Sequence, residues 1–170
     1  AEIVALANAR HTHGPEAIAG STLFVTLEPC STVGRTGACT DAIEAAGIGR
    51  VVVGAIDPNP AHAGAGLDRL RHVGIQVAAG CREAEASRLI RSFAKSITTG
   101  LPYVIAKSAI TLDGRTVLRE SDGPWISSEA SREDVQRIRR SVDAILVGGE
   151  TVRRDNPRLT LRGEFAKDRQ

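Results

Sequence analysis

Apolar residues recur with two different periods in the first part of the chain. Over Thr22–Leu27 every second residue is aliphatic, which is typical of a β-strand. The β-branched run 51–54 favours a buried parallel strand, and residues 75–78 predict a third strand. Strands that alternate with helices of about ten residues predict βα units and a parallel sheet. The expected helices lie at 1–10, from Cys39 to Gly47, at 66–73 and over 81–99, with a loop at 15–21.

The pattern changes at Leu101-Pro102, which predicts a domain boundary and two parts, 1–100 and 101–170. The second part contains one capped helix, which begins after Ser127-Ser128 and runs to Arg140. A short helix is expected after Gly148-Gly149. The fold class is therefore α/β in both parts. The expected strands of the second part are 103–108, 116–118, 144–147 and 159–162.

The composition excludes several classes of protein. The chain has 170 residues, of which 42% are apolar and 25% charged, as expected for one or two domains with buried cores. A net charge of +2 without a basic tract, and 3% aromatic residues, argue against a nucleic-acid partner. No apolar run approaches the ~20 residues that cross a bilayer, so no membrane partner is expected. Three cysteines cannot pair evenly, which favours a reducing, cytoplasmic compartment.

Two cysteines stand where they could share one metal ion. In the stretch TLEPCSTVGRTGACT, Cys30 follows the end of a strand and Cys39 stands where a helix begins. A helix N-terminus favours the thiolate form of Cys39, and the thiolate is the form that binds metals. Cys81 is instead predicted to be a small buried hydrophobe. His11 and His13 are expected in a solvated turn at the end of the first helix.

These positions fit the needs of a zinc-dependent deaminase. Such a site needs three protein ligands, an open position for water and a carboxylate that carries protons. Its usual sequence form is H-x-E on a helix and P-C-x-x-C at a strand-to-helix junction. This chain has Glu2 in its first helical turn and eight residues between Cys30 and Cys39. Glu2 is placed like the proton carrier, although an acid at a helix start more often only complements the helix dipole.

A set of motifs covers nearly the whole chain. They are AEIVAL (1–6), TLEPCSTVGRTGACTDAI (26–43), DPNPAHAGAGLDRL (57–70), AITLDGRT (109–116), WISSEA (125–130), DAILVGGETVRRDNPRLT (143–160) and Arg162. In this order they resemble the bifunctional deaminase/reductase family of riboflavin biosynthesis. The eight-residue gap between the cysteines is specific, because nucleoside and tRNA deaminases use a gap of about two residues.

The resemblance implies that residues 1–100 form a cytidine-deaminase-like α/β/α layer that binds Zn²⁺. This part would remove the ring amino group of 2,5-diamino-6-ribosylamino-4(3H)-pyrimidinone 5′-phosphate and release ammonia. Glu2 would be the catalytic residue, with Cys30 and Cys39 as zinc ligands. The third ligand, a histidine, would lie one residue before Ala1.

The loop between the two cysteines carries the substrate contacts that the resemblance implies, Arg35 and Thr36. A guanidinium suits the substrate phosphate because it donates hydrogen bonds in a fork. Without the resemblance, Arg35 would be interpreted as a solvated loop charge. Thr32 stands where the family usually has a histidine, which keeps open a non-catalytic zinc-binding or assembly module. A further alternative is a zinc deaminase that acts on another pyrimidine.

From Pro102 on, the resemblance implies the start of a dihydrofolate-reductase-like α/β domain. This domain would use NADPH to reduce the ribosyl group to ribityl. The implied NADPH contacts are Ala109, Trp125, Thr151 and Asp155. The implied substrate contacts are Arg139, Leu159 and Arg162, with Lys107 as a further candidate. Taken alone, a tryptophan is more often a core residue and a helical arginine more often solvated.

The sequence also predicts an internal fragment of a longer polypeptide. It contains no methionine, and its first helix begins at Ala1 without a cap. The second part stops soon after Arg162, which is early for a closed sheet. Gly123 stands where the family commonly has a serine. The resemblance implies a homo-oligomer whose other partner is a small phosphorylated pyrimidine, and it assigns both activities to the full-length protein.

Overall fold

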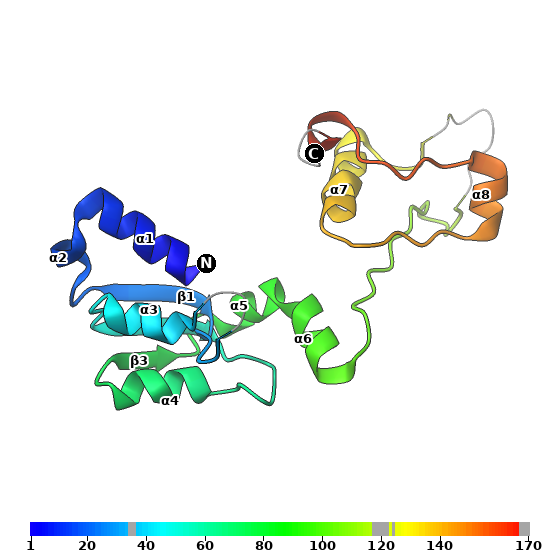
Figure 1. Cartoon of the computed structure of the whole chain (residues 1–170). Helices are drawn as coiled ribbons and strands as arrows, with labels where there is room; N and C mark the ends of the chain where they lie inside the picture. The colour runs from blue at the N-terminus through cyan, green and yellow to red at the C-terminus, as the bar shows by residue number, and fades with distance from the viewer. Residues whose placement is uncertain (34–36, 117–122, 124, 167–170) are drawn as a thin grey trace. The chain divides into compact units, whose positions relative to one another are not determined.

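A three-stranded parallel sheet lies at the centre of the first half of the chain. The computed structural model describes residues 1–33, 37–116, 123 and 125–166. The strands are β1 (Thr22–Leu27), β2 (Arg50–Ala55) and β3 (Gln76–Ala79), in the order β1-β2-β3 (Figure 1). Both pairings are parallel, and Val51 of β2 stands opposite Leu23 and Val77. The predicted parallel sheet is therefore confirmed.

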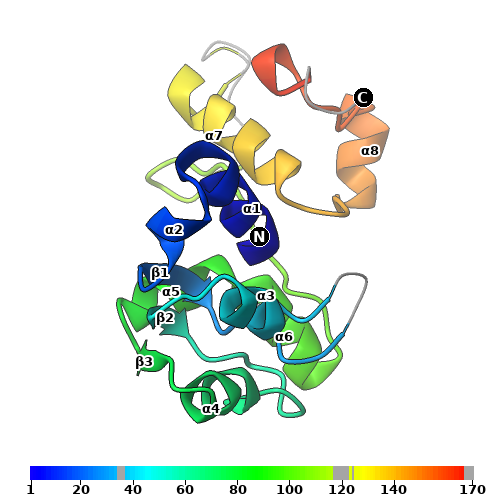
Figure 2. The ribbon, with the colours of Figure 1, turned by 60° about the vertical axis from the view of Figure 1, so that its left-hand side comes forward.

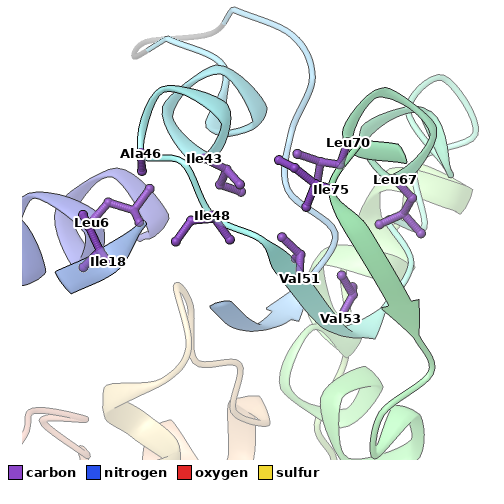
Figure 3. Packing of buried hydrophobic residues seen from close by; sticks show 10 residues of the cluster. All are labelled: Leu6, Ile18, Ile43, Ala46, Ile48, Val51, Val53, Leu67, Leu70 and Ile75. Atoms are coloured by element: carbon purple, nitrogen blue, oxygen red, sulfur yellow. The ribbon is translucent and has the colours of Figure 1, made fainter. Parts of the chain in front are cut away.

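Two crossover helices cover one face of this sheet. They are α3 (Cys39–Ala45), which connects β1 to β2, and α4 (Ala65–His72), which connects β2 to β3. Their apolar side chains meet alternate residues of β2, and Val51 and Val53 are fully buried. Figure 3 shows these side chains pointing into one cluster between the helices and the strand. The cluster consists of Leu6, Ile18, Ile43, Ala46, Ile48, Val51, Val53, Leu67, Leu70 and Ile75.

The N-terminal helix belongs to the same layer. Helix α1 (Glu2–His13) contributes the buried Leu6, and α2 (Pro15–Ile18) contributes the buried Ile18. The predicted first helix is confirmed and extends through His13, whereas the predicted loop at 15–21 contains α2. The guanidinium of Arg10 donates a hydrogen bond of 2.6 Å to the carbonyl of Ala45. This bond fixes one end of α1 against the last turn of α3.

Helix α5 (Glu83–Leu89) packs on the opposite face of the sheet (Figure 2). A Cβ added to Gly54 of β2 would lie 2.6 Å from the Cβ of Ala86, so only glycine allows this close approach. Because successive strand residues point to opposite faces, Gly54 faces away from the core side of Val53. The first half is thus a three-layer α/β/α arrangement.

The predicted helix over 81–99 forms in two pieces. Helix α5 ends at Leu89 and α6 (Arg91–Thr99) follows after Ile90. Cys81 lies in the turn before α5 and is exposed, so the prediction of a buried cysteine is wrong. The reason is local, since the turn between β3 and α5 presents no side chain to the core cluster.

The chain divides into two compact units, Ala1–Ile105 and Ala106–Gln170. The predicted boundary after Gly100 thus lies within the first of these units, close to its end. The second unit contains α7 (Glu129–Arg140), α8 (Gly149–Asp155) and the 3-10 helix η2 (Gly163–Ala166).

The predicted cap of α7 is confirmed. The Ser128 hydroxyl accepts a hydrogen bond of 3.2 Å from the N–H of Ser131. Such a bond satisfies one of the amide groups that the first turn of a helix leaves without an internal partner.

The strands predicted at 103–108, 144–147 and 159–162 are wrong, because these described segments form no ladder. A strand needs a neighbour for its backbone hydrogen bonds, and these segments pair with none. Val104 is 78% exposed and Leu146 is 97% exposed, which fits extended chain without a packed face. Of the expected strand 116–118, only Thr116 lies within the described residues.

Within the residues that the structure describes, no helix is both long and apolar enough to cross a membrane.

Candidate active site

Cys30 and Cys39 are neighbours because the end of β1 meets the start of α3. Pro29 is fully buried, and the chain turns there to present Cys30 at the surface. The N–H of Cys39 donates a hydrogen bond of 3.3 Å to the sulfur of Cys30. The N–H of the buried Thr40 donates one of 3.1 Å to the carbonyl of Cys30. The first turn of α3 therefore holds both the backbone and the sulfur of Cys30.

The carboxylate of Glu2 lies beside the second thiol. The Cys39 thiol donates a hydrogen bond of 3.3 Å to Oε2 of Glu2. The Glu2 side chain is 17% exposed, so this corner is partly shielded from water. Helix α1 carries Glu2 in its first turn and packs along α3, which begins at Cys39. The structure thus brings together Glu2, Cys30 and Cys39 from three separate elements.

Burial first, and then the hydrogen bonds with Cys30 and Glu2, together raise the pKa of the Cys39 thiol from 9.0 to about 12. Cys39 therefore keeps its proton among these electron-rich neighbours, and the prediction that the helix N-terminus favours its thiolate form is wrong. A divalent cation would displace that proton on binding.

The donor set fits zinc, because zinc accepts soft thiolate ligands in tetrahedral sites. Among the described residues, no group of three or more His, Cys, Asp or Glu side chains is arranged to hold a metal ion. The two thiols would therefore supply two of its ligands, with Glu2 adjacent as a proton carrier.

One residue of this region, Glu28, escapes the sequence analysis. Its side chain is buried, with the residue 5% exposed, and its carboxylate accepts hydrogen bonds from the backbone of the 57–67 segment. Two signals in the sequence point to it. It directly precedes Pro29-Cys30, and the segment that it binds contains the closely spaced Gly64 and Gly66.

In the second unit, the predicted substrate contacts on α7 and on 159–162 lie together. The guanidinium of Arg139 donates a hydrogen bond of 3.1 Å to the carbonyl of Thr160, next to Leu159. The backbone N–H of Arg162 donates one of 3.1 Å to the side chain of Gln136. Leu159 has a left-handed backbone with φ 55°. Arg139 is half-buried and bonded, rather than simply solvated as the bare sequence suggests.

The predicted cofactor contacts lie in three places of this unit. Thr151 and Asp155 are one turn apart on α8 and are exposed. Trp125 is 60% exposed, and the Arg132 guanidinium lies 4.7 Å from its ring centroid, so it is not a core residue. Ala109 is half-buried in the irregular segment that also carries Lys107, which is exposed. Within the described residues, no hydrogen bond joins Lys107 or Ala109 to α7 or α8.

Arg35 and Thr36, the predicted substrate contacts of the cysteine loop, lie outside the described residues.

Two family descriptions match the chain, one for each half. Residues 1–55 match the cytidine and deoxycytidylate deaminase zinc-binding region, and residues 102–170 match the RibD C-terminal domain. The first match contains Glu2, Cys30 and Cys39, and the second contains every residue predicted for the reductase half.

Individual relatives agree. The riboflavin biosynthesis protein RibD of Escherichia coli is 48% identical over 143 residues, which is 84% of this chain and 39% of the relative. RibD of Aquifex aeolicus is 46% identical over 162 residues, which is 95% of this chain and 44% of the relative. The chain thus spans about two fifths of the length of these relatives.

Solved structures give the same result. A diaminohydroxyphosphoribosylaminopyrimidine deaminase/5-amino-6-(5-phosphoribosylamino)uracil reductase of Thermotoga maritima superposes with a TM-score of 0.86 and 41% identity. The alignment covers 96% of this chain and 46% of that one. Acinetobacter baumannii RibD gives a TM-score of 0.81 and 40% identity, and covers 94% of this chain and 44% of that one.

The fold and the paired cysteines define the class: a deaminase zinc-binding region followed by a reductase-type domain. Within that class, the chain belongs to the RibD family of riboflavin biosynthesis proteins.

Proposed function

We propose that this protein performs two successive steps of riboflavin biosynthesis. The first is a zinc-dependent hydrolytic deamination of a diaminopyrimidinone ribosylamine 5′-phosphate. The second is an NADPH-dependent reduction of the ribosyl group to ribityl. The observation that carries the proposal is the hydrogen bond from the Cys39 thiol to the Glu2 carboxylate, at a position where the Cys30 sulfur accepts from the N–H of Cys39. Membership in the RibD family supports the choice of substrate.

In the first step Cys30 and Cys39 would hold the zinc ion. Zinc, when bound, supplies Lewis acidity that lowers the pKa of a water molecule toward neutrality. The thiols would bind as thiolates, so that the proton of Cys39 is lost when the metal enters. The short connections of Cys30 to the first turn of α3 would keep the two sulfurs at a fixed spacing.

The proton balance of the deamination assigns a role to Glu2. Water adds to the ring carbon that carries the amino group, the C–N bond breaks, and ammonia leaves as the carbonyl forms. The Glu2 carboxylate would accept a proton from the attacking water and pass it to the neighbouring ring nitrogen. It would then carry the proton of the new hydroxyl group to the departing amine as the carbonyl forms. Its position beside Cys39 and its low exposure suit this transfer, because few waters compete for the proton.

In the second step the residues of the second unit would bind and orient. NADPH, when bound, supplies the hydride, and the ring oxygen of the sugar takes a proton as the ring opens to the ribityl chain. Arg139 and Arg162 carry positive charge near Leu159 and suit a phosphorylated substrate. The cofactor side would be lined by Trp125, Thr151, Asp155 and Ala109, and Lys107 would contact the substrate of this step.

In the first step, the substrate contacts would be Arg35 and Thr36.

The test uses the protein expressed from its complete open reading frame, loaded with zinc. Release of ammonia from the diaminopyrimidinone phosphate, followed by NADPH consumption, is the expected result. Cytosine, cytidine and deoxycytidylate in the same assay separate this substrate from other pyrimidines. A folded, zinc-loaded protein that releases no ammonia from any of them would refute the proposal and favour a zinc-binding assembly module.

We also propose that the protein acts in the cytoplasm as a homo-oligomer. All three cysteines are free, which fits a reducing compartment. Size-exclusion chromatography with light scattering tests the oligomeric state, and a monomer at micromolar concentration would contradict it.

A further inference from the structure

The Glu28 carboxylate gathers four backbone N–H groups from a distant segment. Its Oε2 accepts from Asp57 at 3.1 Å and from Gly64 at 2.9 Å. Its Oε1 accepts from Gly66 at 2.9 Å and from Leu67 at 3.4 Å. A buried carboxylate is costly unless its oxygens are satisfied, and here both oxygens are.

These bonds cap helix α4 from another element. The N-cap residue of α4 is Gly64, which has no side chain to accept from the first turn. Glu28 takes over that role for the N–H groups of Gly66 and Leu67, and its negative charge also suits a helix N-terminus. The Glu28 carboxylate thus holds the end of β1 against the start of α4, and these hydrogen bonds form the joint between the two segments.

A second contact reinforces the joint. A Cβ added to Gly66 would lie 2.0 Å from the carbonyl oxygen of Pro29, so the backbones of the two segments touch. Pro29 lies between Glu28 and Cys30, which leaves little freedom for the turn that presents the Cys30 thiol.

Helix α4 also contacts α3, the helix that begins at Cys39. Arg69 of α4 pairs with Asp41 of α3, two residues after Cys39. Contacts therefore connect Glu28 to α4 and α4 to α3. Cys39 at the start of α3 in turn bonds to Cys30, which follows Glu28 by two residues in the chain.

We infer that Glu28 is a positioning residue for the two thiols, because it locks α4 and the 57–67 segment against the turn that carries Cys30. This inference rests on the proposed zinc site. It assigns to Glu28 no contact with substrate or metal.

The first test needs no substitution. Coupling between two sites is reciprocal, so if the joint positions the thiols, bound zinc must in turn stabilise the joint. Hydrogen exchange of the Asp57, Gly64, Gly66 and Leu67 amides is measured in the protein from the complete reading frame, with and without zinc. We expect at least about tenfold slower exchange with zinc at these amides, and no change at the Ala94 amide of α6 or at the amide of its C-cap residue Gly100.

The second test is Glu28→Gln, with Glu85→Gln, at an exposed position of α5, as the matched control. The glutamine amide nitrogen would face two backbone donors, and we expect zinc affinity to fall about tenfold or more, while the control keeps it. Unchanged zinc affinity in folded Glu28→Gln would overturn the inference. If that variant fails to fold, the exchange experiment decides: zinc binding that leaves the four amides unchanged overturns the inference alone. Absence of zinc binding in the wild type would instead remove the proposed site itself.

Discussion

The thiol of Cys39 lies 3.3 Å from the carboxylate of Glu2, although 37 residues separate them in the chain. The contact exists because α1 packs along α3 with its first turn at the first turn of α3. It joins the proposed proton carrier to a proposed metal ligand, and it makes the two roles separable by substitution.

Glu2→Gln should abolish deamination while leaving zinc in place. The amide cannot carry the proton from water to the leaving amine, so we expect the deamination rate to fall about 100-fold or more. Zinc content should remain that of the wild type, since both thiols are intact. The matched control is Glu16→Gln in α2, which should change neither quantity. Loss of zinc together with activity would show that Glu2 is a ligand instead.

The pH dependence of the metal-free protein should report the Cys39 thiol. Its pKa in the folded chain is raised from 9.0 to about 12, so the folded state holds this proton more tightly than the unfolded state. The stability that this provides is complete below pH 9.0 and is lost as the pH rises toward 12.

We therefore expect the melting temperature of the wild type to fall relative to that of Cys39→Ser as the pH rises from about 8 to about 10.5 in the presence of a chelator. Thermal melts of both proteins at both pH values measure this difference. A constant difference between the two proteins would contradict the assigned pKa shift.

Gly54→Ala should destabilise the first unit. The added Cβ would lie 2.6 Å from the Cβ of Ala86 and 2.8 Å from the carbonyl oxygen of Thr26. Overpacking of this kind costs about 1–3 kcal/mol. The control is Gly37→Ala, where no heavy atom lies within 4 Å of the added Cβ and the change should stay within about 0.5 kcal/mol. Equal stability of the two variants in denaturant melts would show that α5 does not pack closely on β2.

Ser128→Ala should loosen the first turn of α7. Loss of an N-cap side chain costs about 1 kcal/mol, which corresponds to about fivefold faster hydrogen exchange of the Ser131 amide. Ser92→Ala, at an exposed position of α6, serves as the control. Exchange of the Ser131 amide at the wild-type rate would mean that the Ser128 hydroxyl does not cap the helix.

The sequence predicts the first unit well because its patterns are local. The alternation of apolar residues in β1 and the valines of β2 predict two strands. Parallel pairing with neighbouring strands then satisfies their backbone hydrogen bonds. The sequence does not predict the break between α5 and α6 at Ile90, nor the exposure of Cys81 in the turn before α5. Both features depend on how α5 packs on the sheet. In the second unit, β-propensity at Val104 or Leu146 cannot form a ladder without a partner strand, and none forms among the described residues.

The candidate active site likewise contains residues that the sequence predicts and one that it does not. Cys30, Cys39 and Glu2 are recognisable from motif spacing, although only the structure brings their side chains together. Glu28 was missed because its partners are backbone N–H groups of the 57–67 segment, which leave no side-chain signature. Its place before Pro29-Cys30 and the closely spaced Gly64 and Gly66 are visible in the sequence, but only burial and hydrogen-bond geometry show that they belong together.

X-ray absorption at the zinc edge, on the protein expressed from its complete open reading frame, shows whether Cys30 and Cys39 share one zinc ion. We expect two sulfur ligands per zinc at about 2.3 Å, falling to one in Cys30→Ser and unchanged in Cys81→Ser. Zinc without sulfur ligands, or a sulfur count that Cys30→Ser leaves at two, would show that the two cysteines do not bind it together.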